Sequence, residues 1–263
     1  MKVLSDFVES MFFHCDGRAY WKPEHYGLLG KSFKPLTKRG NTLDGLVLES
    51  PRAKEKKKVV LYFHSAEFNR EFNLPQVVFL AMAGFRVLLF DYSGCGLSTG
   101  KGTLDGLGED AESVLGWLDG SPYKSASLTF FAQGVGCDAA LQLMALHPAR
   151  CNGLILESAY CSRSGWIKER WGPVIGDLAA HALQCHAPDP GSILEKVRVP
   201  ILLIYPECDD FVRVGQREAV ISKTRKASVW IVPGKRFLGI FADAQGKWHQ
   251  DVVKFIRGTK TFG

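Results

Sequence analysis

The chain has 263 residues, of which 46% are hydrophobic and 23% charged, and its formal net charge is +6. This is an ordinary globular composition, and the length suits one large α/β domain spanning residues 1–263. The charge is modest and dispersed, without interleaved aromatic and basic residues, which argues against nucleic acid as a partner. No stretch approaches the ~20 apolar residues that a transmembrane segment requires.

Residues 3–13 are predicted to form an N-terminal amphipathic helix. Its apolar residues share one helical face: Val3, Leu4, Phe7, Val8, Met11 and Phe12. We expect this face to pack against the rest of the domain. Contact with a membrane surface or a partner is the alternative.

Strand and helix patterns alternate along the rest of the chain, without repeats or a flexible linker. The expected strands are 32–36 and 43–48, which form a leading hairpin, then 59–63, 85–90, 128–131, 153–156, 201–205 and 228–232. The expected helices are 75–83, 107–118, 138–144, 215–224 and 245–256. This alternation predicts an α/β fold with a mostly parallel, doubly wound sheet and helices on both faces.

The cysteines and histidines are arranged without a ligand pattern. Seven cysteines, an odd number without C-x-x-C spacing, predict reduced thiols in a cytoplasmic protein. His181 and His186 are five residues apart, which is poor spacing for shared ligation. We therefore expect no metal site and no cofactor.

The segment 131–136, Phe-Ala-Gln-Gly-Val-Gly, joins a predicted strand to a predicted helix. A nucleophile elbow, G-x-S-x-G, occupies this kind of turn, where small flanking residues let the backbone fold tightly. Ala132 and Gly136 are such flanks, but Gly134 stands where the serine belongs. No side-chain oxygen is available there for covalent attack.

The glycine-rich string 91–100, Asp-Tyr-Ser-Gly-Cys-Gly-Leu-Ser-Thr-Gly, follows another predicted strand. Together with the elbow, with Tyr-Phe-His at 62–64 and with Leu-Glu-Ser-Ala-Tyr at 156–160, it resembles the α/β-hydrolase superfamily. The resemblance is to its compact, short-capped serine hydrolases and covers about residues 20–256. It implies an α/β-hydrolase fold, with region 160–196 as a short cap over the pocket.

The resemblance also assigns the triad, whose chain order in this fold is nucleophile, acid, histidine. Pro206–Val212 resembles the acid loop and puts Asp209 at the acid position, and 232–239 resembles the histidine loop and puts Phe237 at the histidine position. A phenyl ring cannot exchange a proton, so the general base is missing as well. Without a histidine to orient, Asp209 is expected to cap nearby backbone amides.

Backbone donors of an oxyanion hole are still expected, because they do not depend on side chains. The candidates are the amides of Val135 and of Ser65 or Ala66. The pocket candidates are His64, Glu67 and Gln133.

Two functions of different classes follow. The first is a catalytically inactive relative of α/β-hydrolases that binds a small-molecule ligand or a partner protein. The second is an active esterase, thioesterase or peptidase-like hydrolase with a displaced nucleophile, for which the thiols of Cys95, Cys137 and Cys208 are candidates. The absent serine and histidine favour the first.

Overall fold

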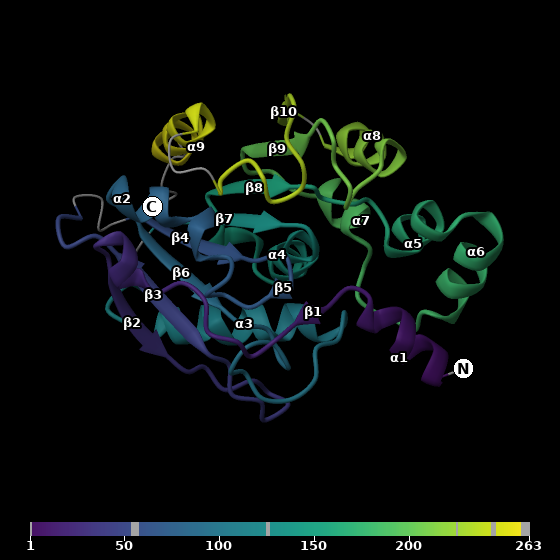
Figure 1. The fold of residues 1–263 in the computed structure, drawn as a ribbon, viewed down its shortest axis with the longest axis horizontal. Helices are drawn as coiled ribbons and strands as arrows, with labels where there is room; N and C mark the ends of the chain where they lie inside the picture. The colour runs from purple at the N-terminus through teal and green to yellow at the C-terminus, as the bar shows by residue number, and fades with distance from the viewer. Residues whose placement is uncertain (1, 54–57, 125–126, 225, 243–245, 259–263) are drawn as a thin grey trace.

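The computed structural model describes residues 2–53, 58–124, 127–224, 226–242 and 246–258. Its centre is an eight-stranded sheet in the order β10-β9-β8-β7-β4-β6-β3-β2 (Figure 1). The strands are β2 (Leu29–Phe33), β3 (Gly45–Glu49), β4 (Lys58–Phe63), β6 (Arg86–Phe90), β7 (Ser127–Gln133), β8 (Gly153–Glu157), β9 (Ile201–Pro206) and β10 (Ser228–Val232). A separate two-stranded parallel sheet joins β1 (His14–Cys15) to β5 (Glu67–Phe68).

The pairing confirms the predicted sheet. Strand β3 is antiparallel to both β2 and β6, as the leading hairpin required, and every other neighbouring pair is parallel. The carboxyl ends of β4, β7, β8, β9 and β10 therefore lie at one edge of the sheet, where ligands bind in open α/β folds. The predicted site residues lie at the ends of four of these strands, β4, β7, β9 and β10, or in the loops that follow them.

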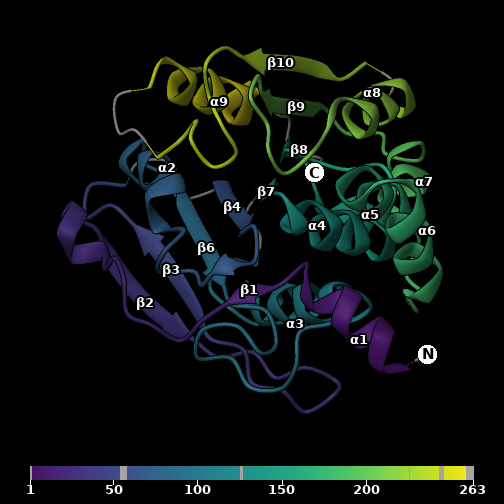
Figure 2. The ribbon, with the colours of Figure 1, turned by 45° about the vertical axis from the view of Figure 1, so that its right-hand side comes forward.

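Helices cover both faces of the sheet (Figure 2). The α-helices are α1 (Lys2–Ser10), α2 (Val78–Met82), α3 (Gly106–Asp119), α4 (Val135–Leu146), α5 (Arg163–Trp171), α6 (Pro173–Ala182), α7 (Pro190–Leu194), α8 (Val214–Lys223) and α9 (Lys247–Gly258), with 3-10 turns η1 (Pro23–Tyr26), η2 (Leu74–Gln76) and η3 (Pro148–Arg150). One apolar core lies under α3 and α4 and the other under α2 and α9. Of the helix predicted at 245–256, residue 245 lies outside the described residues.

The cap region contains the three helices α5, α6 and α7, and a buried ion pair fastens it to α4. Asp138 of α4 accepts hydrogen bonds from Arg163 Nε and Nη2, at 2.8 and 2.7 Å, and from the Tyr160 hydroxyl at 2.7 Å. Removing one partner of such a pair leaves an uncompensated buried charge, at a cost of about 3–5 kcal/mol. The cap is thus held to the helix that follows the elbow.

The prediction that the apolar face of the N-terminal helix packs against the rest of the domain is wrong for part of that face. Val8 and Phe12 are buried, whereas Val3 and Phe7 are 83% and 62% exposed. At 100° per residue, positions 3 and 7 lie on one flank of the apolar face and position 8 on the other, and only the flank with Val8 reaches the core. Helix α1 packs beside α6 at one end of the molecule (Figures 1 and 2). Among the described residues, no helix combines the length and apolar character needed to cross a membrane.

The prediction that all cysteines are reduced is also wrong. Cys15 and Cys95 form a disulfide, with their Cα atoms 4.9 Å apart and a separation of 80 residues in sequence. The pairing of β1 with β5 brings Cys15 against the glycine-rich turn that holds Cys95. The spacing of the two cysteines in the sequence does not indicate that they come together in the fold. The cytoplasmic location inferred from reduced thiols stays a prediction.

Candidate active site

The elbow is a tight turn between a buried strand and a buried helix. Strand β7 ends at Gln133 and α4 begins at Val135, so Gly134 alone makes the turn. Its φ of 55° and ψ of −122° lie in a region that residues with a Cβ rarely adopt, and its amide donates to the Glu157 carbonyl at 2.9 Å. Glycine relieves the strain that a serine would carry here.

Phe237 fills the space beside this turn. A Cβ atom at position 134 would lie 2.7 Å from Phe237 Cζ and 3.4 Å from Phe211 Cε1. The two rings stack, with centroids 4.7 Å apart and an interplanar angle of 17°. Aromatic rings therefore occupy the volume into which a nucleophile would project.

The aromatic pair is the inner end of a larger cluster. Phe211 packs against Trp166 of the cap, with centroids 5.3 Å apart, and the Trp166 indole donates to the Phe211 carbonyl at 2.7 Å. Trp166 in turn packs against Phe12, at 4.6 Å, from the segment that follows α1. Cap, acid loop and N-terminal segment thus close over the elbow with apolar contacts.

Asp209 lies in the loop after β9 and accepts hydrogen bonds from backbone amides of that loop. Its Oδ1 accepts from the amides of Phe211 and Val212, each at 2.9 Å, as expected for an acid without a histidine. Burial raises the pKa of Asp209, and these two amides oppose the rise. Its Oδ2 is buried and has no well-formed hydrogen bond among the described residues, although the nearby Ser158 hydroxyl helps to lower the pKa.

An open cavity of about 460 Å³ lies on the outer side of this loop. Asp209, Glu169 and Glu207 line it together with Arg213 and Arg217. Neither Gly134 nor Phe237 is among its lining residues. The recess that reaches the acid position therefore does not reach the elbow.

The oxyanion-hole candidates divide into two groups. The Ala66 amide donates to His64 Nδ1 at 3.2 Å and is already engaged. Val135 is the first residue of α4, where helix amides have no intrahelical acceptor. No hydrogen bond joins the amide of Val135 or of Ser65 to another group within the described parts of the chain. Two backbone donors thus remain available.

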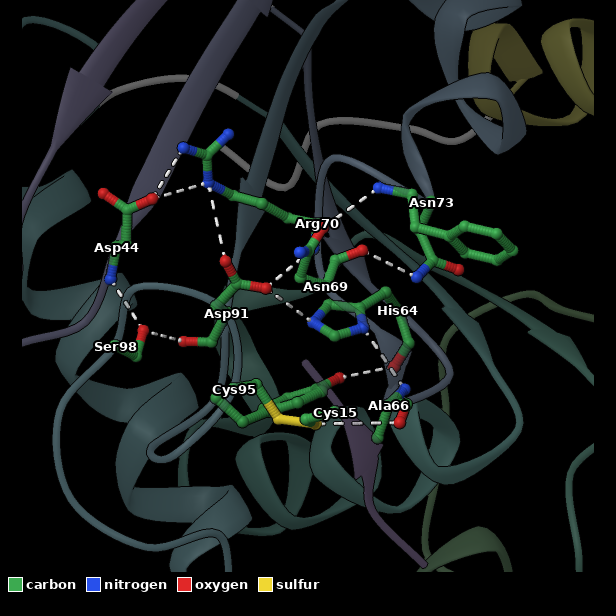
Figure 3. A network of polar contacts seen from close by, with 12 residues as sticks. Cys15, Asp44, His64, Ala66, Asn69, Arg70, Asn73, Asp91, Cys95 and Ser98 are labelled. Atoms are coloured by element: carbon green, nitrogen blue, oxygen red, sulfur yellow. Dashed lines mark hydrogen bonds and ion pairs between the residues drawn. A yellow bond between two sulfur atoms is a disulfide. The ribbon is translucent and has the colours of Figure 1, made fainter. Parts of the chain in front are cut away.

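His64 is fully buried and belongs to a polar network with Asp91 and Arg70 (Figure 3). Its Nε2 lies 3.5 Å from Asp91 Oδ1, and its carbonyl accepts from the Tyr92 hydroxyl at 2.8 Å. Asp91 also accepts from the Arg70 amide at 2.6 Å, while the Arg70 guanidinium binds Asp44. Both nitrogens of His64 have a neighbour in the loops, which is the arrangement of a structural histidine.

Gln133 is a second pocket candidate that is buried in a network. Its Oε1 accepts from the Tyr62 hydroxyl, and its Nε2 donates to Glu157 Oε2 at 2.6 Å and to Gln76 Oε1 at 3.2 Å. Gln76 donates to the carbonyl of Leu238, next to Phe237, at 2.9 Å. The network links the elbow strand to the loop that carries Phe237.

Glu157 was not assigned a role from the sequence, although it lies in the quoted segment 156–160. Burial, followed by the charge of Asp209, raises the pKa of Glu157 to about 8, while hydrogen bonds from Gln133 and the Leu238 amide oppose the rise. At neutral pH the group is mostly a neutral acid. The raised pKa comes from the burial of strand β8 and the approach of Asp209, and neither can be predicted from the local sequence.

The remaining candidates are directed elsewhere. Glu67 Oε1 lies 3.2 Å from His14 Nδ1, so this acid contacts the N-terminal strand β1. Cys137 is buried, donates to the Glu157 carbonyl at 3.3 Å, and has a pKa that burial raises well above the ordinary thiol value. His186 Nδ1 lies 3.0 Å from Asp105 Oδ2. Within the described residues, no three His, Cys, Asp or Glu side chains gather as a metal site would need.

Comparison with known proteins places these features in context. No family model matches the chain. Protein bem46 of Schizosaccharomyces pombe is 25% identical over 196 residues, 72% of this chain and 64% of that protein. The uncharacterized protein Rv2307c of Mycobacterium tuberculosis is 29% identical over 170 residues, 63% of this chain and 58% of that protein. The match thus spans less than two thirds of either relative.

A solved structure of the Pyrococcus furiosus esterase Pf2001 superposes with a TM-score of 0.74. The two chains are 15% identical, and the superposition covers 93% of this chain and 96% of the esterase. The strand order, the helices on both faces and this likeness agree: the chain has the α/β-hydrolase fold.

Proposed function

We propose that this α/β-hydrolase-fold protein is catalytically inactive and acts by binding a ligand or a partner protein. One observation carries the proposal: the ring of Phe237 lies against Gly134, where a working elbow would project its nucleophile. Gly134 offers no attacking atom, and Phe237 offers no base. Since triad residues act as a unit, losing both forfeits several orders of magnitude in rate.

The unused acid supports this assignment. Asp209 keeps two amide hydrogen bonds but leaves Oδ2 buried without a well-formed partner. A buried carboxylate oxygen normally has a donor, and in a triad that donor is the imidazole. Phe237, at the position assigned to the histidine, has no donor to offer this oxygen.

The alternative is a hydrolase with a displaced nucleophile, and it finds little support in the thiols. A nucleophilic cysteine needs a thiolate, whereas burial raises the pKa of Cys137 far above neutrality. Cys95 is bound in the disulfide. Cys208 is exposed, and no hydrogen bond joins its thiol to a histidine ring within the described residues.

A binding role needs a surface, and helices α1 and α6 provide one. Large apolar side chains project from both, at 62% to 83% exposure: Val3, Phe7, Val174, Ile175 and Leu178. The two helices contact each other, and exposed apolar residues that gather on one surface are typical of interaction sites. The aromatic cluster fills the space at the elbow, so we place the contact with a partner protein on this outer face.

Ester hydrolysis tests the inactivity. We expect the purified chain to cleave p-nitrophenyl acetate and butyrate no faster than a heat-denatured sample. Cys137→Ala and Cys208→Ala should leave that rate unchanged. Turnover that either substitution abolishes would establish the displaced-nucleophile hydrolase instead.

A double substitution tests the assignment of the elbow. Gly134→Ser alone should destabilise the protein because its Cβ meets Phe237, and Phe237→His should relieve part of that loss. A structure of the double variant should place the introduced hydroxyl and the introduced imidazole within hydrogen-bonding distance of each other, beside Asp209. Side chains that point apart would refute the assignment.

The proposed surface is tested by matched variants. Phe7→Ser with Leu178→Ser changes the α1–α6 face, and Leu36→Ser with Met82→Ser changes exposed apolar residues elsewhere. Partner proteins recovered with the unmodified chain and the control, but not with the first variant, would identify this face. Flotation with phosphatidylcholine vesicles that only the first variant loses would assign the face to a lipid surface and overturn the protein contact.

A further inference from the structure

A groove at the opposite edge of the sheet has no part in the proposed function. It lies between the last turn of α4, helix α7 and the segment 196–199 that leads into β9, and its volume is about 330 Å³. Helix α4 runs away from the elbow, so its last turn lies at the amino ends of the strands. A ligand here would not touch the elbow, and the inference stands independently of the triad assignment.

The walls of the groove are apolar and its rim is basic. Met144, Ile193, Val197 and Val199 line the walls, and Met144 and Ile193 are buried parts of the core. Lys196 and Arg198 also line the groove and are exposed. Small-molecule sites combine these two features, a mostly apolar lining with a few placed polar groups.

The two rim cations, Lys196 and Arg198, form no ion pair with a carboxylate of the described residues. Arg198 Nη1 donates to the carbonyls of Glu195 and Val197, at 2.8 and 3.0 Å, which positions the guanidinium without using its charge on a carboxylate. The acids of the flanking segment are engaged by other cations, Glu195 by Lys223 at 2.5 Å and Asp189 by Arg163 at 3.5 Å. No ion pair with a carboxylate forms at Lys196 or Arg198 within the described residues.

We propose that this groove binds an amphiphilic anion with one aliphatic chain. The chain lies along the apolar walls, and the anionic head is held by Lys196 and Arg198. The volume of about 330 Å³ is near the lower limit of the range for small-molecule sites, roughly 300–1,000 Å³, which suits one chain and excludes two. Carboxylate and phosphate heads share the required charge and geometry for an arginine.

Calorimetric titration of the full chain tests the proposal with three probes at submicellar concentration. Decanoate and decyl phosphate carry an anionic head, and decanol carries the same alkyl chain without charge. We expect both anions to bind at least about tenfold more tightly than decanol, since two exposed charge contacts contribute on this scale. The anion that binds more tightly, decanoate or decyl phosphate, identifies the preferred head group. Decanol binding as tightly as the anions would overturn the proposal.

Variants locate the site. Lys196→Gln with Arg198→Gln should lower the affinity for decanoate to that for decanol, and the charge-matched control Lys31→Gln with Lys124→Gln should not. Ala145→Trp, at an exposed position of the lining, should fill the groove and abolish binding of all three probes. Ser192→Trp provides the same test from the facing helix should Ala145→Trp not fold. Undiminished binding to a folded groove-filling variant would refute the site.

Discussion

Glu157→Gln should remove a pH dependence of stability that the buried acid creates. In the folded chain the pKa of Glu157 is raised to about 8 from an ordinary value of 4.5. Between these pH values the unfolded chain has released the proton and the folded chain retains it, so rising pH favours unfolding. The acid's contribution is therefore fully present below about pH 4.5 and lost by about pH 8.

The magnitude follows from the width of that window. Each pH unit corresponds to about 1.4 kcal/mol, so the interval from 4.5 to about 8 amounts to at most about 5 kcal/mol. Glutamine keeps an acceptor oxygen for Gln133 Nε2 and cannot ionise. The free energy of unfolding of the variant should therefore equal that of the unmodified protein near pH 4.5 and exceed it by a growing margin up to about pH 8.

Urea unfolding at intervals from pH 4.5 to 9 measures the difference in free energy of unfolding between the two proteins. The titration of other groups largely cancels in this difference. Glu218→Gln, which removes an exposed carboxyl, controls for the change in net charge. A difference that is constant across the range, or that favours the unmodified protein as pH rises, would refute the reasoning about Glu157.

Three further outcomes are expected from urea unfolding. Gly134→Ala should cost about 1–3 kcal/mol or more, because a Cβ is strained at φ 55° and meets Phe237, and a neutral effect would contradict the strained elbow. Phe12→Ala should cost about 3–5 kcal/mol and Phe7→Ala less than about 0.5 kcal/mol, whereas equal losses would show that the N-terminal segment does not divide into a buried and an exposed part. Cys15→Ser should lower the free energy of unfolding by up to about 4.5 kcal/mol in the absence of reductant, because the disulfide closes a loop with a sequence separation of 80 residues. Reductant should cause a similar loss in the unmodified protein and none in the variant. A loss in the variant that is unchanged when both proteins are reduced would argue against the disulfide.

The order and type of the elements followed from local pattern. Runs such as 59–63 and 87–90 are apolar throughout because central parallel strands are covered on both sides, so their burial can be predicted directly from the sequence. Alternation with helices then left few topologies, so the parallel sheet with its leading hairpin was predictable. The sequence also shows directly that position 134 carries no hydroxyl and position 237 no imidazole, because the residue types are glycine and phenylalanine.

The tertiary structure decided what these residues do to one another. Loops after β7, β9 and β10 converge only when the sheet forms, and that convergence puts the Phe237 ring on Gly134 and its stacking partner Phe211 beside it. The pairing of Cys15 with Cys95 and the raised pKa of Glu157 arise in the same way, from approach and burial between segments far apart in sequence. Periodicity and composition describe one segment at a time, so the sequence by itself determined the fold and showed that positions 134 and 237 carry neither a hydroxyl nor an imidazole. What fills their place depends on long-range packing.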